Sequence, residues 1–145
     1  MRGYAARRLA EIGPRVRGVR PRFALAVSEH AEQCALIEWW ALECRRHGLD
    51  ERNLFAIPNA GAGGSRGQGG KMKAEGARAG VPDLLLAVAR GRAHGLFIEM
   101  KALNQRARPD QRAYHELLEA QGYRVRVCQG AKHAMAEITA YLEGL

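Results

Sequence analysis

Two apolar segments lie so close together in the sequence that they constrain the fold more than any other feature. Residues 83–89 and 95–101 are rich in Leu, Ile, Val and Phe, and only five residues, Arg90 to His94, separate them. A polar link of this length that contains a glycine is typical of a β-hairpin. We therefore expect two neighbouring antiparallel strands in the centre of a sheet.

The N-terminal half adds one helix and one strand to this hairpin. Ser28, with two acids in the following four residues, predicts the N-cap of a helix that Gly48 ends. Residues 54–57 form a short apolar run that Pro58 stops, which favours a buried strand over a helix. The chain thus begins its core with a helix and a strand.

The C-terminal half continues with a helix, a strand and a helix. Pro109 and Gly122 bracket a helix over residues 110–121. Residues 123–128 alternate apolar residues with arginines, as a strand does, and residues 131–142 form a last helix. The inner face of the first of these helices is predicted to carry Tyr114, Leu117 and Leu118. Two strands joined through a helix require a right-handed crossover. The predicted fold is therefore an α/β three-layer sandwich with a mixed central β-sheet, in the order αβββαβα.

A glycine-rich segment interrupts this pattern over residues 59–70. It has six glycines among twelve residues and no large apolar side chain, so we expect a mobile surface loop, followed by a short helix over residues 71–79. Ser65 and Met72 break the nucleotide-binding P-loop pattern, which argues against a nucleotide cofactor. Either the loop is inert, or it contacts a nucleic-acid backbone, with nearby cations contributing: Arg66, Lys71, Lys73 and Arg78.

Positive charge is concentrated at the N-terminus. The formal net charge is +8, and residues 1–22 contain seven arginines and a single glutamate. We interpret residues 1–27 as a flexible basic arm, either a solvated tail or a strap that neutralises phosphates, and residues 28–145 as a single domain. No apolar run is long enough to span a membrane and no secretion signal precedes residue 13, so we expect a cytoplasmic protein.

Cysteines, histidines and tryptophans give weaker indications. The three cysteines have no close-spaced metal-ligand pattern, so we expect buried reduced thiols, and we expect the five scattered histidines to lie at the surface. Trp39 and Trp40 cannot both face the core from one helix, so one of them should be partly exposed. An exposed tryptophan is a hint of a homodimer.

Three ionisable residues in the hairpin indicate chemistry. Asp83 begins one apolar strand, and Glu99 and Lys101 interrupt the other on the same face. Two carboxylates that converge across a hairpin suit Mg²⁺ or Mn²⁺, and the backbone carbonyl of Met100 is a further candidate ligand. Such a metal assists hydrolysis of a phosphodiester, with Lys101 positioning or deprotonating the attacking water. The alternative is a Glu99–Lys101 salt bridge with Asp83 merely capping a turn.

The spacing of Pro82-Asp83 and Glu99-Met100-Lys101 resembles the PD-(D/E)xK nuclease signature. More specifically, residues 28–142 resemble the VRR-NUC (virus-type replication-repair nuclease) family. The matching segments are residues 29–33, 56–59, 73–76, 79–83 and 96–101, and Gln111 followed by Gly122-Tyr123. The chain departs from the family at Arg108-Pro109-Asp110, where a small hydroxyl residue is more usual, so we expect a different local helix cap.

The resemblance implies a function and a set of site residues. It implies a restriction-endonuclease-like fold and a DNA-cleaving nuclease of phage or bacterial replication, repair or recombination. An acid on the first helix joins the metal cluster in that family, and we favour Glu29 over Glu32 because it shares the core-facing stripe with Leu36. Gln111 resembles the glutamine that orients the lysine or the phosphate. Predicted nucleic-acid contacts also include Asn59 and Tyr114, although core packing is the plainer role for the tyrosine.

Two other classes of function remain open from the sequence. A non-catalytic nucleic-acid-binding module would use the same basic arm and loop without turnover. A small assembly protein of a phage particle would bind another protein and act on no nucleic acid. Cutting of DNA, and its dependence on a divalent metal ion, separates the nuclease from both.

Overall fold

The computed structural model describes residues 28–58 and 66–145, and it contains one mixed four-stranded sheet in the order β1-β2-β3-β4. β1 to β3 pair antiparallel and β4 pairs parallel to β3. Two short 3-10 turns, η1 (Cys44–His47) and η2 (Glu51–Asn53), link α1 to β1. The main elements are α1 (Glu29–Glu43), β1 (Leu54–Ala56), α2 (Arg66–Ala74), β2 (Leu84–Leu86), β3 (Leu96–Lys101), α3 (Pro109–Ala120), β4 (Arg124–Gln129) and α4 (Ala131–Glu143).

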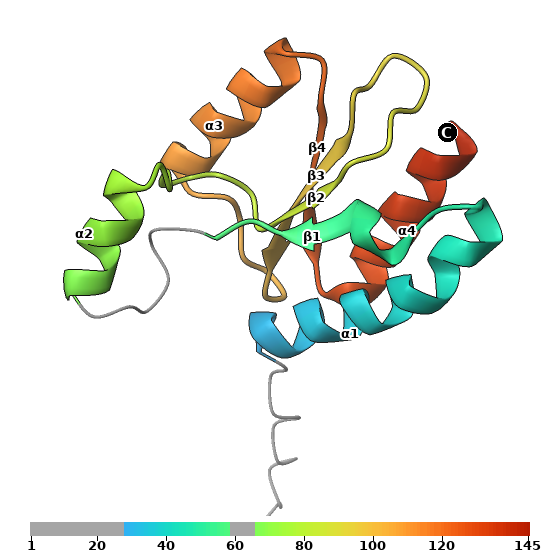
Figure 1. The fold of residues 1–145 in the computed structure, drawn as a ribbon, viewed down its shortest axis with the longest axis horizontal. Coiled ribbons are helices and arrows are strands. Elements are labelled where there is room, and N and C mark those ends of the chain that lie inside the picture. The colour runs from blue at the N-terminus through green and yellow to red at the C-terminus, as the bar shows by residue number, and fades with distance from the viewer. Residues whose placement is uncertain (1–27, 59–65) are drawn as a thin grey trace, which may run out of the picture.

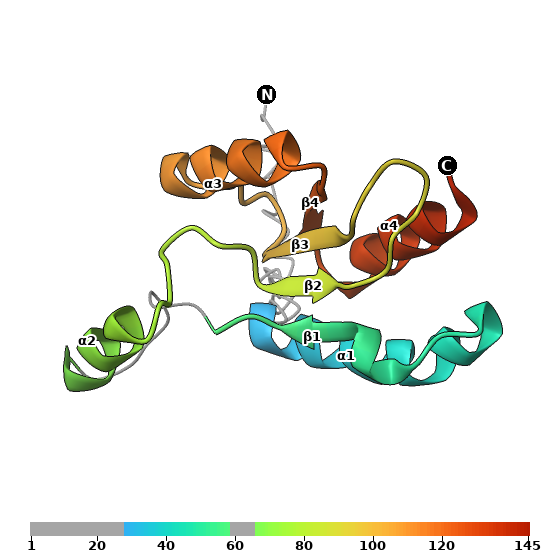
Figure 2. The ribbon, with the colours of Figure 1, turned by 45° about the horizontal axis from the view of Figure 1, so that its top comes forward.

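Helices cover both faces of the sheet, which confirms the predicted three-layer α/β sandwich. α1 and α4 lie together against one face and α3 lies against the other (Figures 1 and 2). The larger core lies on the α1/α4 face and includes Leu36, Trp40, Ile98, Met100 and Ile138. The smaller core lies under α3 and consists of Phe97, Leu118 and Val125, with partly buried neighbours. The two cores differ in size because α3 alone covers its face.

The predicted hairpin is present, and its register positions the acidic residues. Leu84 pairs with Ile98 and Leu86 with Leu96, and a bridge between Arg90 and Ala93 closes the turn. β3 runs beyond the point where β2 begins, so the same register places Asp83 opposite Glu99. The polar residues therefore gather where β2 starts and β3 ends.

The first helix begins and packs as its sequence predicts. The Ser28 side chain accepts a hydrogen bond of 3.2 Å from the backbone N–H of Ala31, and Leu36 and Trp40 are buried. Trp39 is half-buried, which confirms that only one tryptophan faces the core fully. Cys44 and Cys128 are buried thiols, but the expectation of burial is wrong for Cys34, which is exposed because it lies on the outer side of α1.

The structure corrects the predicted loop and one helix face. α2 begins at Arg66, inside the predicted loop, and ends at Ala74, because glycine weakens a helix without excluding helical dihedral angles. Leu117 is 56% exposed rather than inward, since Gln111, His115 and Leu118 occupy the inner face of α3. The predicted basic arm and residues 59–65 of the loop lie outside the described residues. No helix in the described ranges is long and apolar enough to cross a membrane.

Candidate active site

Glu99 and Lys101 lie side by side on the α3 face of β3. Phe97 on this strand belongs to the core under α3, whereas Ile98 and Met100 belong to the opposite core, so strand alternation turns Glu99 and Lys101 toward α3. Lys101 Nζ lies 2.6 Å from Glu99 Oε1, and the side chains are only 10% and 1% exposed. Glu99 and Lys101 therefore share one face of the strand, as predicted, and both side chains are largely buried from solvent.

Asp83 approaches the same end of β3 from the neighbouring segment. Its Oδ2 atom accepts a hydrogen bond of 2.8 Å from the backbone N–H of Met100, and its carbonyl accepts one of 2.8 Å from Ile57 N–H. Gly80, with φ +85°, allows the preceding turn to pack on α3, because a Cβ there would lie 2.7 Å from the Asp110 carbonyl oxygen. The chain around Asp83 is thus fixed between β3 and α3.

Asp83, Glu99 and Lys101 form a cluster at the end of β3, and of the two candidate acids on α1, only Glu29 reaches it. Glu29 Oε1 accepts a hydrogen bond of 2.9 Å from the backbone N–H of Ala102, two residues beyond the N–H that Asp83 binds. Glu32 Oε2 instead accepts a hydrogen bond of 2.7 Å from Ala131 N–H and so caps the N-terminus of α4. Glu29 thus lies at the cluster and Glu32 has a structural role, while a metal-binding role for Glu29 stays a prediction.

α3 contributes Gln111 and His115 to the cluster. Gln111 Oε1 accepts a hydrogen bond of 2.9 Å from Arg108 N–H, and its Nε2 donates to Glu99 Oε1. The Arg108 side chain makes no capping hydrogen bond. That this cap departs from the family pattern stays a prediction. His115 Nε2 lies 3.8 Å from Glu99 Oε2, and both atoms are buried without a hydrogen-bond partner.

His115 is the site neighbour that the sequence analysis missed. A surface position is wrong for this histidine, which is 8% exposed, because it follows Gln111 by one helical turn and so shares its inward face. Burial lowers its pKa and the Lys101 charge adds to the shift, while the Glu119 and Asp83 charges oppose it. The ring is therefore neutral at neutral pH, and its contact with Glu99 is not an ion pair. The i+4 spacing from Gln111 was the available signal.

The carboxylates in the cluster destabilise one another's charge. Burial raises the pKa of Asp83, although the Met100 N–H and the Lys101 charge oppose the shift, and the Glu29 charge adds to it. Burial likewise raises the pKa of Glu99, the bond from Lys101 opposes the shift, and the Asp83 charge adds to it. A cation beside these groups would relieve the repulsion.

The cluster suits a hard divalent cation that keeps most of its water. Within residues 28–58 and 66–145, no group of three or more Asp, Glu, His or Cys side chains is arranged around one metal position. Mg²⁺, however, is commonly bound by one or two carboxylates with water in the other positions. Asp83 and Glu99 match this chemistry, since Glu99 Oε2 is buried and unpartnered.

Three of the predicted nucleic-acid contacts, Lys71, Lys73 and Arg78, lie in α2 or just after it. Figures 1 and 2 show α2 apart from the sheet, joined to β2 by the segment that carries Asp83. Lys71 and Lys73 are exposed, with Lys71 Nζ 3.8 Å from a Glu75 oxygen, and Arg78 donates to the carbonyls of Lys73 and Ala77. Tyr114 is half-buried and packs on the core under α3. The Asn59 position and the Arg66 side chain lie outside the described part of the structure.

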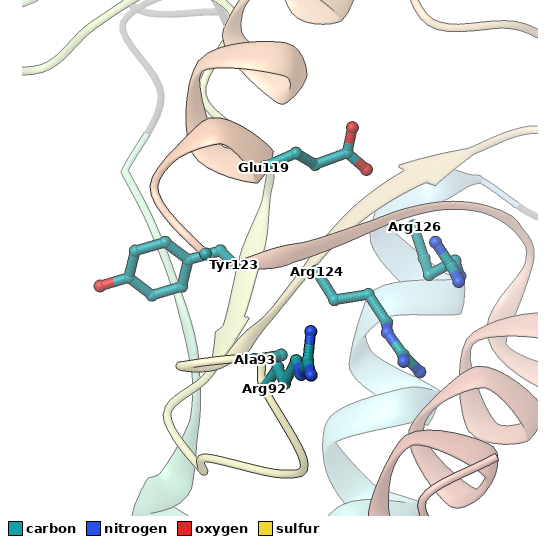
Figure 3. A pocket seen from close by; sticks show the side chains of 7 residues that line it. Arg92, Ala93, Glu119, Tyr123, Arg124 and Arg126 are labelled. Carbon is teal, nitrogen blue, oxygen red and sulfur yellow. The ribbon is translucent and has the colours of Figure 1, made fainter.

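A second polar surface lies at the other end of β3 and does not belong to the carboxylate cluster. An open pocket of about 410 Å³ lies around the start of β4, and Figure 3 shows the side chains that line it. Two of its arginines are already used within the fold: Arg124 lies 5.5 Å from the centre of the Tyr141 ring, and Arg126 pairs with Glu137 at 2.9 Å. The other lining residues are Arg92, Ala93, Glu119, Gly122 and Tyr123. Arg124 and Arg126 therefore have partners within the chain, and we assign the pocket no function.

A family model described as the VRR-NUC domain matches residues 28–132, which include every residue of the cluster. The chain belongs to the VRR-NUC family. A solved structure titled "VRR_NUC domain protein" is 28% identical, with a TM-score of 0.67 over 80% of this chain and 88% of that one. Another, "VRR_NUC domain", is 22% identical, with a TM-score of 0.47 over 76% and 97%. The comparison with curated proteins gives no match. Membership of this nuclease family confirms the predicted resemblance and fold class.

Proposed function

We propose that this VRR-NUC protein is a divalent-metal-dependent nuclease that hydrolyses DNA phosphodiester bonds. The observation that carries the proposal is the convergence of Asp83, Glu99 and Lys101 where β3 ends, with both carboxyl pKa values raised. Perturbed carboxylates that share a small site with a lysine are typical of catalytic centres. The proposed setting is phage or bacterial DNA replication, repair or recombination.

The proposed metal ligands are the Asp83 and Glu99 carboxylates, with Glu29 and the Met100 carbonyl completing the set. The N–H and C=O of a strand residue face the same side, so the Met100 carbonyl faces the side from which Asp83 binds its N–H. Bound there, Mg²⁺ or Mn²⁺ would polarise the scissile phosphate and lower the pKa of its water. Membership of a nuclease family that generally depends on divalent metals supports this assignment.

Lys101 and Gln111 have complementary roles in the proposed reaction. Lys101 Nζ is held against Glu99 and is only slightly exposed, so it can donate a hydrogen bond that positions an attacking water. Gln111 bridges the Arg108 backbone and Glu99, which fixes the carboxylate relative to α3. Fixed orientation matters because a small misplacement of a reacting group is costly in rate.

The DNA backbone is proposed to contact the basic residues near α2 in addition to this centre. Lys71, Lys73 and Arg78 are exposed and lie in the segment before Asp83. Phosphate contacts of this kind position the substrate without selecting its sequence. Arg66, Asn59 and Tyr114 complete the proposed set of contacts, and a homodimer remains a prediction.

One observation favours a non-catalytic nucleic-acid-binding module as a second candidate. The site acids already have internal partners: Met100 N–H for Asp83, Ala102 N–H for Glu29, and Lys101 for Glu99. Each of these contacts forms without a metal cation, and only Glu99 Oε2 among the oxygens of the buried Glu99–Lys101 pair is left without a partner in the described part of the chain. A binding module would hold DNA and cut none of it.

Cleavage assays separate the two candidates. Wild-type protein should nick or cut labelled DNA with Mg²⁺ or Mn²⁺ and should stop when EDTA is added. Asp83→Ala and Lys101→Ala should abolish cutting while thermal unfolding stays cooperative, which shows that the variants are folded. Binding without cutting under all divalent ions, or wild-type rates in both variants, would favour the module instead.

A further inference from the structure

Arg108 occupies a position beside the carboxylate cluster that the proposed function does not yet use. It stands in the Arg108-Pro109-Asp110 sequence at the start of α3. The residue is the N-cap of α3, and its backbone N–H is hydrogen-bonded to the same Gln111 side chain that donates to Glu99. One side chain therefore links the Arg108 backbone to the proposed catalytic glutamate.

The surroundings hold Arg108 at the rim of the site. Gly80, just before Asp83 in the chain, packs so closely on the Asp110 and Gln111 backbone that a Cβ there would clash at 2.7 Å. Arg112 Nη1 donates a hydrogen bond of 2.8 Å to the Ala107 carbonyl and fixes the turn before α3. The start of α3 and the segment carrying Asp83 thus form one packed unit.

The Arg108 guanidinium is exposed and only partly engaged. Its Nε and Nη2 atoms each lie 3.2 Å from an Asp110 carboxylate oxygen, while Nη1 makes no hydrogen bond with any residue that the structure describes. Asp110 is the main cause of a raised Arg108 pKa, and the Glu99 and Asp83 charges contribute to the same shift. The geometric link to the site is the backbone, since the Arg108 N–H is joined to Glu99 through the single Gln111 side chain.

A second arginine in this chain, Arg52, shows that an ion pair with a nearby aspartate does not by itself mark Arg108 as a binding residue. Arg52 and Asp50 form a similar two-bond pair, at 2.8 and 2.9 Å, between exposed residues that are also two positions apart, in the reverse order. The charges that act on Arg52 are those of Asp50 and Glu51 and include no site carboxylate. What separates Arg108 from Arg52 is its location beside Asp83 and Glu99.

We propose that Arg108 binds a non-bridging oxygen of a DNA phosphate at the rim of the active site, adjacent to the phosphate that is cut. The inference rests on the proposed function, which supplies the polynucleotide substrate. A polyanion that approaches buried carboxylates is repelled, and a guanidinium beside them offsets the repulsion. The planar guanidinium fork also matches phosphate geometry. Asp110 keeps the fork in place before DNA arrives.

The test measures DNA binding without divalent ions, so that no cutting interferes. Fluorescence anisotropy of a labelled oligonucleotide in EDTA, over a range of NaCl concentrations, gives the affinity and its salt dependence. Arg108→Ala and Arg108→Gln should each lower the affinity about tenfold. The slope of log affinity against log salt should fall by about 0.9 for a duplex or about 0.7 for a single strand, the effect of one lost phosphate contact. Arg52→Ala, the matched control, should change neither quantity.

Two results would overturn the inference. One is an affinity and a salt slope in both Arg108 variants that equal those of Arg52→Ala. The other is weaker Mn²⁺ binding in Arg108→Ala by calorimetry, which would mean that Arg108 acts through the carboxylates rather than on DNA. Failure of the proposed function is seen separately, because hydrolysis is measured with divalent ions in the unaltered protein.

Discussion

The two faces of β3 carry opposite kinds of side chain, although neighbouring residues on the strand supply both. On the α1/α4 face, Leu96, Ile98 and Met100 are at most 2% exposed and lie in an apolar core that two helices close. On the α3 face, apolar packing at Phe97 gives way to Glu99, which contacts Gln111 of α3, and to its partner Lys101. One strand therefore contributes both to the main core and to the candidate site.

The difference shows how stability and proposed chemistry are divided in this small domain. Burial of apolar side chains on the α1/α4 face supplies stabilising free energy of about 1.5–3 kcal/mol per large side chain. The α3 face instead buries charges and leaves Glu99 Oε2 and His115 Nε2 without hydrogen-bond partners, which costs free energy. Substitutions on the α1/α4 face should thus mainly lower the free energy of unfolding, whereas substitutions on the α3 face should mainly lower DNA cutting.

Glu99→Gln should give the largest effect on activity. The variant keeps the size of the side chain and a hydrogen-bonding oxygen but loses the charge proposed to hold the metal. Because a catalytic metal contributes several kcal/mol to transition-state stabilisation, DNA cutting should fall about a thousandfold or more. Initial rates of cleavage of a labelled oligonucleotide measure the effect, and a rate within tenfold of wild type would break the proposed division between the faces.

Ile98→Ala, one residue away on the opposite face, should show the reverse signature. Ile98 is fully buried, so its truncation should lower the free energy of unfolding by about 2–5 kcal/mol. Cutting per folded molecule should stay near the wild-type value. Urea unfolding followed by circular dichroism, paired with cleavage below the transition, gives both numbers. A large loss of cutting by fully folded Ile98→Ala protein would show that the faces are not independent.

Gly80→Ala should sharpen the comparison by separating backbone strain from contact with α3. Gly80 and Gly91 both have positive φ values, +85° and +56°, but only Gly80 has backbone within contact distance of an added Cβ. Gly91→Ala should cost about 1–2 kcal/mol, and Gly80→Ala should cost more and also lower cutting, because Asp83 and Gln111 move apart. Equal losses of stability and unchanged cutting in the two variants would contradict close packing between the start of α3 and the segment that carries Asp83.

Asp83→Asn should give the smallest effect, a pH-dependent gain in stability. Burial raises the Asp83 pKa in the folded chain above its ordinary value of 3.8, so the folded state keeps this proton to a higher pH than the unfolded state. Ionisation therefore lowers stability as the pH rises from 3.8 through the folded-state pKa, and the loss persists at neutral pH. Without divalent ions, the variant should be more stable than wild type at pH 7, and the gap should shrink toward pH 3.8. Lower stability of the variant at pH 7 would contradict the raised pKa.

The strand and helix order was predictable because local signals agreed with the tertiary structure. Some signals set the local structure without contacts from distant parts of the chain: the Ser28 cap and Pro109 start helices, and the short link at residues 90–94 forms a turn. The common face of Glu99 and Lys101 followed from strand alternation alone. These features needed no knowledge of how the layers pack.

Features that depend on packing between distant elements could not be predicted. Glu32 caps α4, 99 positions along the chain, and no local pattern announces that contact. Leu117 and His115 exchange their expected environments because packing on the sheet sets the rotation of α3 about its axis, and the spacing of His115 from Gln111 was the one local sign of it. The α2 helix forms through a glycine-rich stretch whose propensity argues for a loop.

Calorimetric titration of Mn²⁺ into the full chain tests the proposed metal centre most directly. Wild-type protein should bind Mn²⁺ with a saturable heat signal, and the Asp83→Asn/Glu99→Gln double variant should lose it while remaining folded. The Asp50→Asn variant, which alters an exposed acid at η2, should bind as wild type does. Equal Mn²⁺ binding by the wild type and the double variant, or no binding by the folded wild type, would contradict a metal centre at the end of β3.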